Sequence, residues 1–149
     1  MREVKRSAHV ALPPSRLFTL INDIESYPQF LPWCSHAQVL SRTEREIVAT
    51  IGVRRGPLHG EFTTRNELEP DSKVTMRLVK GPFTMLEGEW RITPAGEGSK
   101  VELALRFQFK HTLSAMLLEH KFAETIGSLV DAFVARSRAM QPAAGLAGP

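Results

Sequence analysis

The chain has 149 residues, a formal net charge of +3 at neutral pH, 42% hydrophobic and 23% charged residues. These proportions are ordinary for a globular protein and exclude a disordered or fibrous class, and the length fits one domain. One cysteine excludes an internal disulfide, the N-terminus lacks a signal peptide pattern, and no run approaches the roughly 18 apolar residues of a spanning helix. The modest charge does not predict DNA binding, and we expect a cytoplasmic protein.

The first 34 residues predict one strand followed by two short helices. Residues 2–12 alternate, with Val4, Ala8 and Val10 on the same side as Arg6, as in a half-exposed strand. Pro13 and the residues after it open a helix, and a shorter helix and loop follow. The stretch "IESYPQFLPWC", residues 24–34, combines large apolar side chains with two prolines that no regular helix or central strand accommodates. It is either packed under the sheet or an apolar lip at the mouth of a cavity.

Residues 35–110 alternate with a period of two and predict about six antiparallel strands, each with one apolar face. In residues 101–109, for example, Val101, Leu103, Leu105 and Phe107 alternate with polar or small residues. The period then changes, and apolar residues at helical spacing predict a long helix over about 114–139. Its apolar face includes Leu117. We expect residues 1–140 to form one domain and residues 141–149 to form a disordered tail.

This order of elements predicts an α+β fold, in which a curved antiparallel sheet of about six to seven strands wraps around a long C-terminal helix. Because a curled sheet and a helix need not touch everywhere, an apolar cavity between them is expected.

The element order and the phrase "SYPQFLPWC" after an amphipathic helix resemble the coenzyme-Q-binding START-like family, with its helix-grip fold. The helix sequence "FAETIGSLVDAFVARS" is similar too, and the resemblance covers residues 1–140. The family's bacterial members include RatA-type ribosome-association toxins, and the absence of a mitochondrial leader makes this chain look bacterial. The resemblance implies binding of a polyprenyl quinone or another lipid, with ubiquinone as the expected ligand, no required cofactor and no catalytic residue.

The inward strand phases, the long helix and the possible lip together give the candidate ligand-binding residues. Thr64 and Asn66 are the clearest polar groups on the inward phase, where they either bind a ligand oxygen or are satisfied locally. The candidates are Tyr27, Phe30, Leu31, Trp33, Phe62, Thr64, Asn66, Met76, Leu86, Trp90, Leu105, Phe107, Phe122, Ile126, Leu129, Val130 and Phe133.

Catalysis has little support in the sequence. The histidines lack metal-ligand spacing, Cys34 is interpreted as a small hydrophobe, and the glutamates of the strands fall on the outward phase. These glutamates are Glu61, Glu67, Glu87, Glu89 and Glu102. A polyketide cyclase, which needs an acid or base in the cavity, stays a distant alternative.

A second function comes from basic residues on the outward phases and turns. They would contact the phosphates of ribosomal RNA in the large subunit, although acidic residues lie between them. The candidates are Arg54, Arg55, Arg65, Lys73, Arg77 and Lys80. We therefore expect first a lipid or ubiquinone carrier that supports respiration, with peripheral contact at the inner membrane if the lip is exposed. The alternative is a toxin that binds the large subunit and blocks subunit association.

Overall fold

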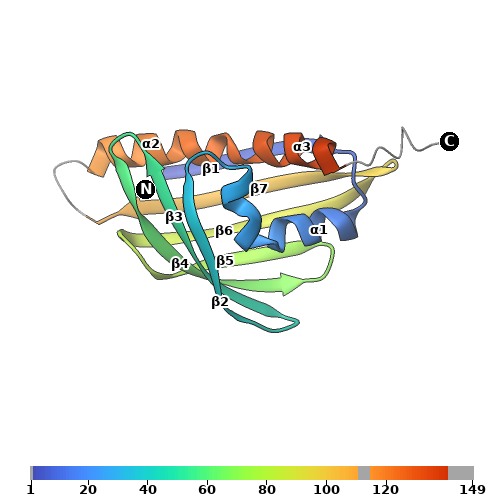
Figure 1. Cartoon of the computed structure of the whole chain (residues 1–149), viewed down its shortest axis with the longest axis horizontal. Coiled ribbons are helices and arrows are strands. Elements are labelled where there is room, and N and C mark those ends of the chain that lie inside the picture. The colour runs from blue at the N-terminus through green and yellow to red at the C-terminus, as the bar shows by residue number, and fades with distance from the viewer. Residues whose placement is uncertain (1, 111–114, 141–149) are drawn as a thin grey trace.

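A computed structural model describes residues 2–110 and 115–140 of the chain. The first strand is followed by two short helices, six more strands and two helices placed end to end (Figure 1). The strands are β1 (Arg2–Val10), β2 (Cys34–Arg42), β3 (Glu46–Arg55), β4 (Leu58–Glu69), β5 (Lys73–Lys80), β6 (Phe83–Ala95) and β7 (Gly98–Phe109). The helices are α1 (Pro14–Asn22), the 3-10 helix η1 (Ile24–Gln29), α2 (Ala115–Gly127) and α3 (Leu129–Met140).

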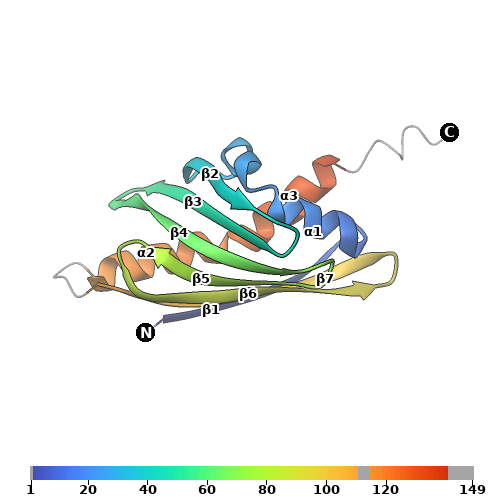
Figure 2. The same cartoon turned by 90° about the horizontal axis from the view of Figure 1, so that it is seen from below.

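The seven strands form one antiparallel sheet in the order β1-β7-β6-β5-β4-β3-β2. Strands β2 to β7 are a simple meander, whereas β1 pairs with the last strand, so that Val4 lies opposite Leu105. Figure 2 shows the sheet curving, with its hairpins at two ends. The β3–β4 and β5–β6 hairpins lie at the same end, because antiparallel pairing places Thr63 opposite Lys80. We call this the hairpin end.

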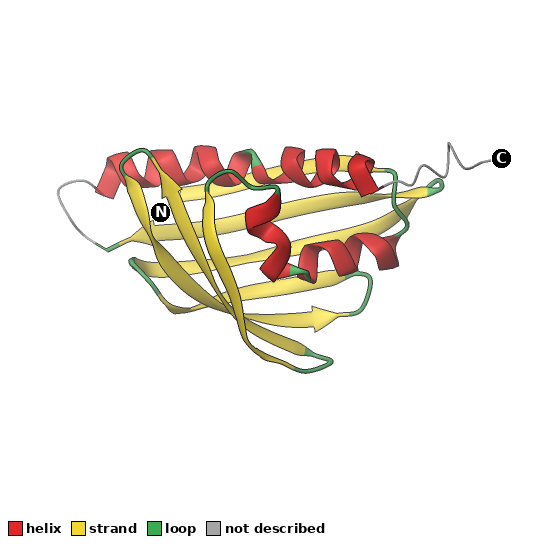
Figure 3. Ribbon diagram, in the orientation of Figure 1, coloured by secondary structure: helices red, strands yellow, loops and turns green. Residues whose placement is uncertain are grey.

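The C-terminal helices lie along the sheet beside β1, while α1 and η1 lie across its other part (Figure 3). The sequence predicts one continuous helix, but the structure interrupts it at Ser128, whose N–H donates to the carbonyls of both Glu124 and Thr125. A Cβ on Gly127 would lie 2.8 Å from a guanidinium nitrogen of Arg6. A glycine at this position therefore allows the β1 side chain to approach the helix closely.

The predicted strand phases are confirmed by burial. Val101, Leu103, Leu105 and Phe107 are all at most 5% exposed, whereas Arg106 between the last two is exposed. The same buried cluster runs from Val4 in β1 to residues of α3. On the C-terminal helix, however, the predicted inward position of Leu117 is wrong, because this side chain is 54% exposed. Leu117 lies in the first turn of α2, next to Met116, which is 83% exposed. The predicted tail, residues 141–149, lies outside the described residues.

The segment "SYPQFLPWC" is packed into the core, and its interpretation as an exposed lip is wrong. Tyr27, Leu31 and Trp33 are buried, and Phe30 is half-buried. The reason is Phe133 of α3, whose fully buried ring stands edge-on to Tyr27 at 5.6 Å and to Phe30 at 5.4 Å between centroids. Sequence spacing gives no indication of this contact, because the two segments are about a hundred residues apart.

Candidate functional site

An apolar pocket in the described part of the chain lies between the sheet and the helices, with about 690 Å³ of space including the open solvent at its mouth. Every layer of the fold contributes to its walls. Its lining is Ile21 and Asn22 of α1, Ile24 and Tyr27 of η1, Trp33, Ile51 of β3, Phe62, Thr64 and Asn66 of β4, Val74 and Met76 of β5, Leu86 and Trp90 of β6, Leu103 and Leu105 of β7, and Phe122, Ile126 and Leu129 of the C-terminal helices.

Most residues predicted to bind a ligand lie in this lining. The structure places Tyr27, Trp33, Phe62, Thr64, Asn66, Met76, Leu86, Trp90, Leu105, Phe122, Ile126 and Leu129 around the cavity. It does not bring Phe30, Leu31, Phe107, Val130 and Phe133 to it. Phe107 instead packs among Phe83, Phe109 and Phe122, and Phe133 is enclosed by Tyr27, Phe30 and Trp90.

Sequence reasoning missed the contributions of α1, of one residue of η1 and of three strand positions: Ile21, Asn22, Ile24, Ile51, Val74 and Leu103. Ile51, Val74 and Leu103 lie on the predicted inward faces of their strands, although they are not among the predicted ligand-binding residues. Asn22 carried a usable signal, because it is a polar residue within the apolar stripe of α1 and is only 7% exposed.

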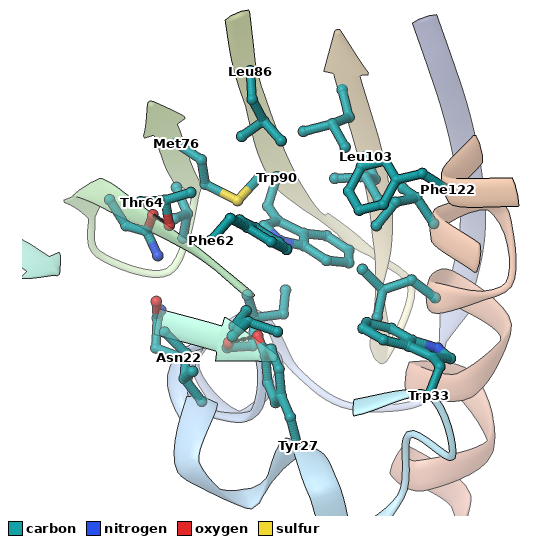
Figure 4. Close-up of a pocket in the computed structure, with 18 residues that line it drawn as sticks. Asn22, Tyr27, Trp33, Phe62, Thr64, Met76, Leu86, Trp90, Leu103 and Phe122 are labelled. Atoms are coloured by element: carbon teal, nitrogen blue, oxygen red, sulfur yellow. Dashed lines mark hydrogen bonds between the residues drawn. The ribbon is translucent and has the colours of Figure 1, made fainter. Parts of the chain in front are cut away.

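Three polar side chains stand in the otherwise apolar lining. The Thr64 hydroxyl donates to Oδ1 of Asn66 at 2.8 Å, and the Asn22 carboxamide nitrogen donates to the Phe18 carbonyl at 2.9 Å. Within residues 2–110 and 115–140, no partner accepts from the Asn66 carboxamide N–H groups, and none donates to Oδ1 of Asn22. Figure 4 shows Asn22 and Thr64 toward one side of the cavity and Phe122 on the side of the C-terminal helix. The Asn66 carboxamide nitrogen is therefore free to donate to a ligand, and the Asn22 carboxamide oxygen is free to accept from one.

The titratable groups near the cavity are held neutral. Burial is the main cause that raises the pKa of the Tyr27 hydroxyl above its ordinary value of 10.0, and this hydroxyl donates to the Ile21 carbonyl. Burial also raises the pKa of the Cys34 thiol to about 11. The lining contains no charged residue, and the outward glutamates Glu61, Glu67, Glu87, Glu89 and Glu102 are absent from it. The cavity thus presents hydrogen-bonding groups, but no side chain in its lining can act as a general acid or base near neutral pH.

The basic residues predicted for RNA contact separate into two groups. Arg54, Arg65, Arg77 and Lys80 are exposed, whereas Arg55 and Lys73 are half-buried. Arg55 donates to the Thr125 hydroxyl of α2 at 3.3 Å, and Lys73 pairs with Glu69 at 3.1 Å. Arg77 lies directly opposite Arg65 across the β4–β5 ladder. Like charges directly opposite one another destabilise a sheet slightly, and here Arg65 also pairs with Glu46 at 3.4 Å.

No group of three or more histidine, cysteine or carboxylate side chains among the described residues is placed to hold a metal ion. None of the helices in this part of the chain is both long and apolar enough to cross a bilayer.

The sequence matches the family model described as polyketide cyclase / dehydrase and lipid transport over residues 10–134. It is 40% identical over 136 residues to the ribosome association toxin RatA of Pseudomonas aeruginosa, covering 91% of this chain and 94% of that protein. It is 34% identical to RatA of Escherichia coli K12, covering 93% and 88%. A more distant relative is the mitochondrial coenzyme Q-binding protein COQ10 homolog B of Xenopus laevis, 25% identical over 88% of this chain and 56% of that protein.

Solved structures agree on the fold. A START superfamily protein from Mycobacterium smegmatis superposes with a TM-score of 0.79 at 20% identity, covering 93% of this chain and 99% of that one. The Zhui aromatase/cyclase from Streptomyces superposes with a TM-score of 0.85 at 19% identity, covering 97% and 98%. At this level of identity the likeness shows the helix-grip fold, not a shared activity.

Proposed function

The chain belongs to the polyketide cyclase / dehydrase and lipid transport family, and we propose that it binds a neutral lipid in the cavity between its sheet and its helices. The observation that carries the proposal is an apolar cavity without charged residues but with one free donor and one free acceptor. Binding rather than turnover follows, because proton transfer needs a group that titrates near the operating pH.

The apolar walls favour a hydrocarbon body. Each buried CH2 contributes about 0.8 kcal/mol, so a few isoprene units supply micromolar affinity or better. The aromatic rings of Trp33, Phe62, Trp90 and Phe122 add flat surfaces for a planar ring.

The polar side chains restrict the head group. A carboxylate or phosphate in this cavity would lose its hydration without gaining a counter-charge, at a cost of several kcal/mol. A carbonyl or methoxy oxygen, in contrast, accepts from Asn66, and a hydroxyl donates to Asn22. A substituted quinone supplies the accepting oxygens, and its quinol form also supplies the donating hydroxyl. The resemblance to coenzyme-Q-binding proteins and the relative from Xenopus support ubiquinone or a similar polyprenyl quinone.

The chain allows a direct binding assay, because its two tryptophans, Trp33 and Trp90, both line the cavity. Titration with a short-tailed ubiquinone should quench their fluorescence to saturation. The double variant Thr64→Val/Asn66→Leu should bind about five-fold more weakly, since one lost hydrogen bond contributes about 1 kcal/mol. The matched control is Thr63→Val, because Thr63 precedes Thr64 on β4 and is equally buried, but it bonds to Thr50 at 2.6 Å and is not part of the cavity lining. Equal affinity of all three proteins would contradict the assignment of the head group, and no saturable quenching would contradict quinone binding.

A second candidate function is association with the large ribosomal subunit, and the relative from Pseudomonas aeruginosa supports it by its name and by 40% identity over nearly the whole chain. The contact surface would be the exposed arginine pair Arg65 and Arg77 with Arg54 and Lys80. Arg65→Ala/Arg77→Ala should reduce co-sedimentation with large subunits and flatten its salt dependence, because each phosphate contact contributes to the salt slope. Arg91→Ala, which removes an exposed arginine that pairs with Glu89 outside the predicted contact surface, is the control. Absence of co-sedimentation at low salt would refute this candidate.

A further inference from the structure

A second apolar hollow of about 430 Å³ lies at the hairpin end of the molecule. Its outer walls include Pro57 and Leu58 of the β3–β4 hairpin, Pro82 of the β5–β6 hairpin and Leu118 of α2. Its inner walls are Phe62 and Phe122, which also line the main cavity. The hollow is thus a vestibule, and a thin aromatic wall separates it from the cavity.

That wall consists of rings that stand edge-on to one another. The centroid of Phe62 is 5.9 Å from that of Phe122 and 5.7 Å from that of Phe83. Phe62 is only half-buried, whereas Phe122 is 1% exposed. Phe62 is therefore the more exposed of the two rings that both spaces share. The backbone of Gly81 packs closely against it, because a Cβ there would lie 2.8 Å from the Phe62 Cβ.

The direction of β4 orients a bound molecule. Phe62, Thr64 and Asn66 are successive inward positions on this strand, and they lead away from the β3–β4 hairpin. At about 3.3 Å per residue, Asn66 lies about 13 Å deeper than Phe62. A ligand whose head reaches Asn66 therefore extends its tail toward the vestibule.

Exposed apolar side chains mark the surface beside the vestibule. Met116 and Leu117, which are 83% and 54% exposed, immediately precede the vestibule residue Leu118. Two large exposed apolar side chains in sequence, next to an apolar hollow, are the usual composition of an interface with a hydrophobic partner.

The charges around these residues identify the partner. Lys80, Lys110 and Lys121 lie at the same end and have no ion pair with any described residue. Nearby acids are already engaged: Glu119 accepts from the Phe109 N–H at 2.9 Å, and Glu61 accepts from His36 at 2.8 Å. Apolar side chains among free lysines suit an anionic lipid surface. The apolar side chains insert into the bilayer, and the lysines bind the head-group phosphates.

We propose that the hairpin end is a membrane-docking portal: Met116 and Leu117 insert into an anionic bilayer, and a lipid passes between Phe62 and Phe122 into the cavity. The portal rests on the proposed lipid binding, whereas the docking surface rests on exposure and charge alone. The segment 27–34, in which Tyr27, Leu31 and Trp33 are buried, has no part in it.

The test is flotation of the whole protein with quinone-loaded phosphatidylcholine vesicles, with and without phosphatidylglycerol. Wild type should float with the anionic vesicles and take up quinone. In Met116→Glu/Leu117→Glu, the fraction of floated protein and the amount of quinone taken up should each fall at least about tenfold. The control is Leu40→Glu, because Leu40 is also 54% exposed but lies near the β2–β3 turn, at the opposite end of the sheet. Undiminished flotation and uptake by the double variant would overturn the proposal, even if that variant lost ribosome association instead.

Two more readouts separate the docking surface, the portal and the site. Quinone delivered from detergent should bind Met116→Glu/Leu117→Glu as tightly as wild type, and weaker binding would overturn a pure docking role. If wild type binds no quinone from detergent, the proposed function fails, and flotation still decides whether the surface docks. Phe62→Ala, which removes the wall, should take up quinone from vesicles several-fold faster at unchanged flotation. An unchanged or slower rate would contradict the portal.

Discussion

Replacing Phe133 by alanine tests whether the segment around Tyr27 and Phe30 is part of the core. The Phe133 ring is fully buried and makes edge-on contacts with Tyr27, Phe30 and Trp90 at 5.3–5.6 Å between centroids. Truncating a buried phenylalanine costs about 3–5 kcal/mol, and each aromatic pair adds about 0.5–1.5 kcal/mol beyond the buried area. The upper part of the range, about 4 kcal/mol, is therefore expected.

The assay is urea unfolding followed by tryptophan fluorescence. Val134→Ala, which alters the adjacent half-buried position of α3, should cost about 1 kcal/mol and serves as the control. Phe30→Ala should lie between the two, since Phe30 is half-buried and also contacts the Arg136 guanidinium at 5.1 Å. A loss below about 2 kcal/mol for Phe133→Ala would refute the packing argument and restore a loosely held lip.

Three further outcomes follow from the structure. Alkylation of Cys34 should be about a hundredfold slower in the folded protein than in urea, since burial raises the pKa of its thiol from 9.0 to about 11; comparable rates would contradict its burial. Burial also raises the pKa of Tyr27 above 10.0, so the folded state keeps this proton longer than the unfolded chain and stability should fall by about 1.4 kcal/mol per pH unit above pH 10. Because Tyr27 is the only tyrosine, tyrosinate absorbance should rise together with unfolding, and an earlier rise would contradict this. Gly98→Ala should destabilise by about 1–3 kcal/mol in urea, because its Cβ would lie 2.3 Å from the Val10 carbonyl oxygen, and an unchanged midpoint would contradict this close approach.

The sheet could be predicted because each strand has one solvent-exposed, polar face and one buried, apolar face. Alternation in β7, for example, fixes which of Leu105 and Arg106 is buried without any tertiary information. The inward phase of β4 was equally readable, and it gave the polar residues Thr64 and Asn66 in the cavity lining.

Features that depend on distant contacts could not be predicted. The helix is interrupted at Ser128 where Arg6 of β1 lies against Gly127, and no local pattern indicates that approach. Likewise, apolar composition alone does not distinguish a lip from a core segment, because the difference is made by Phe133. Leu117 fits the helical period, yet the sheet does not extend far enough to cover it, and it stays exposed at the hairpin end.

The most direct test of ligand binding in the cavity is solvent extraction of the protein, purified from a quinone-producing bacterium, followed by mass spectrometry. We expect the wild-type protein to carry a near-stoichiometric amount of a neutral polyprenyl lipid. The amount bound should fall several-fold in Thr64→Val/Asn66→Leu and stay unchanged in Thr63→Val. A protein that carries no lipid and takes up no added quinone would contradict this expectation. The exposed arginine pair Arg65 and Arg77 would then become the leading functional surface.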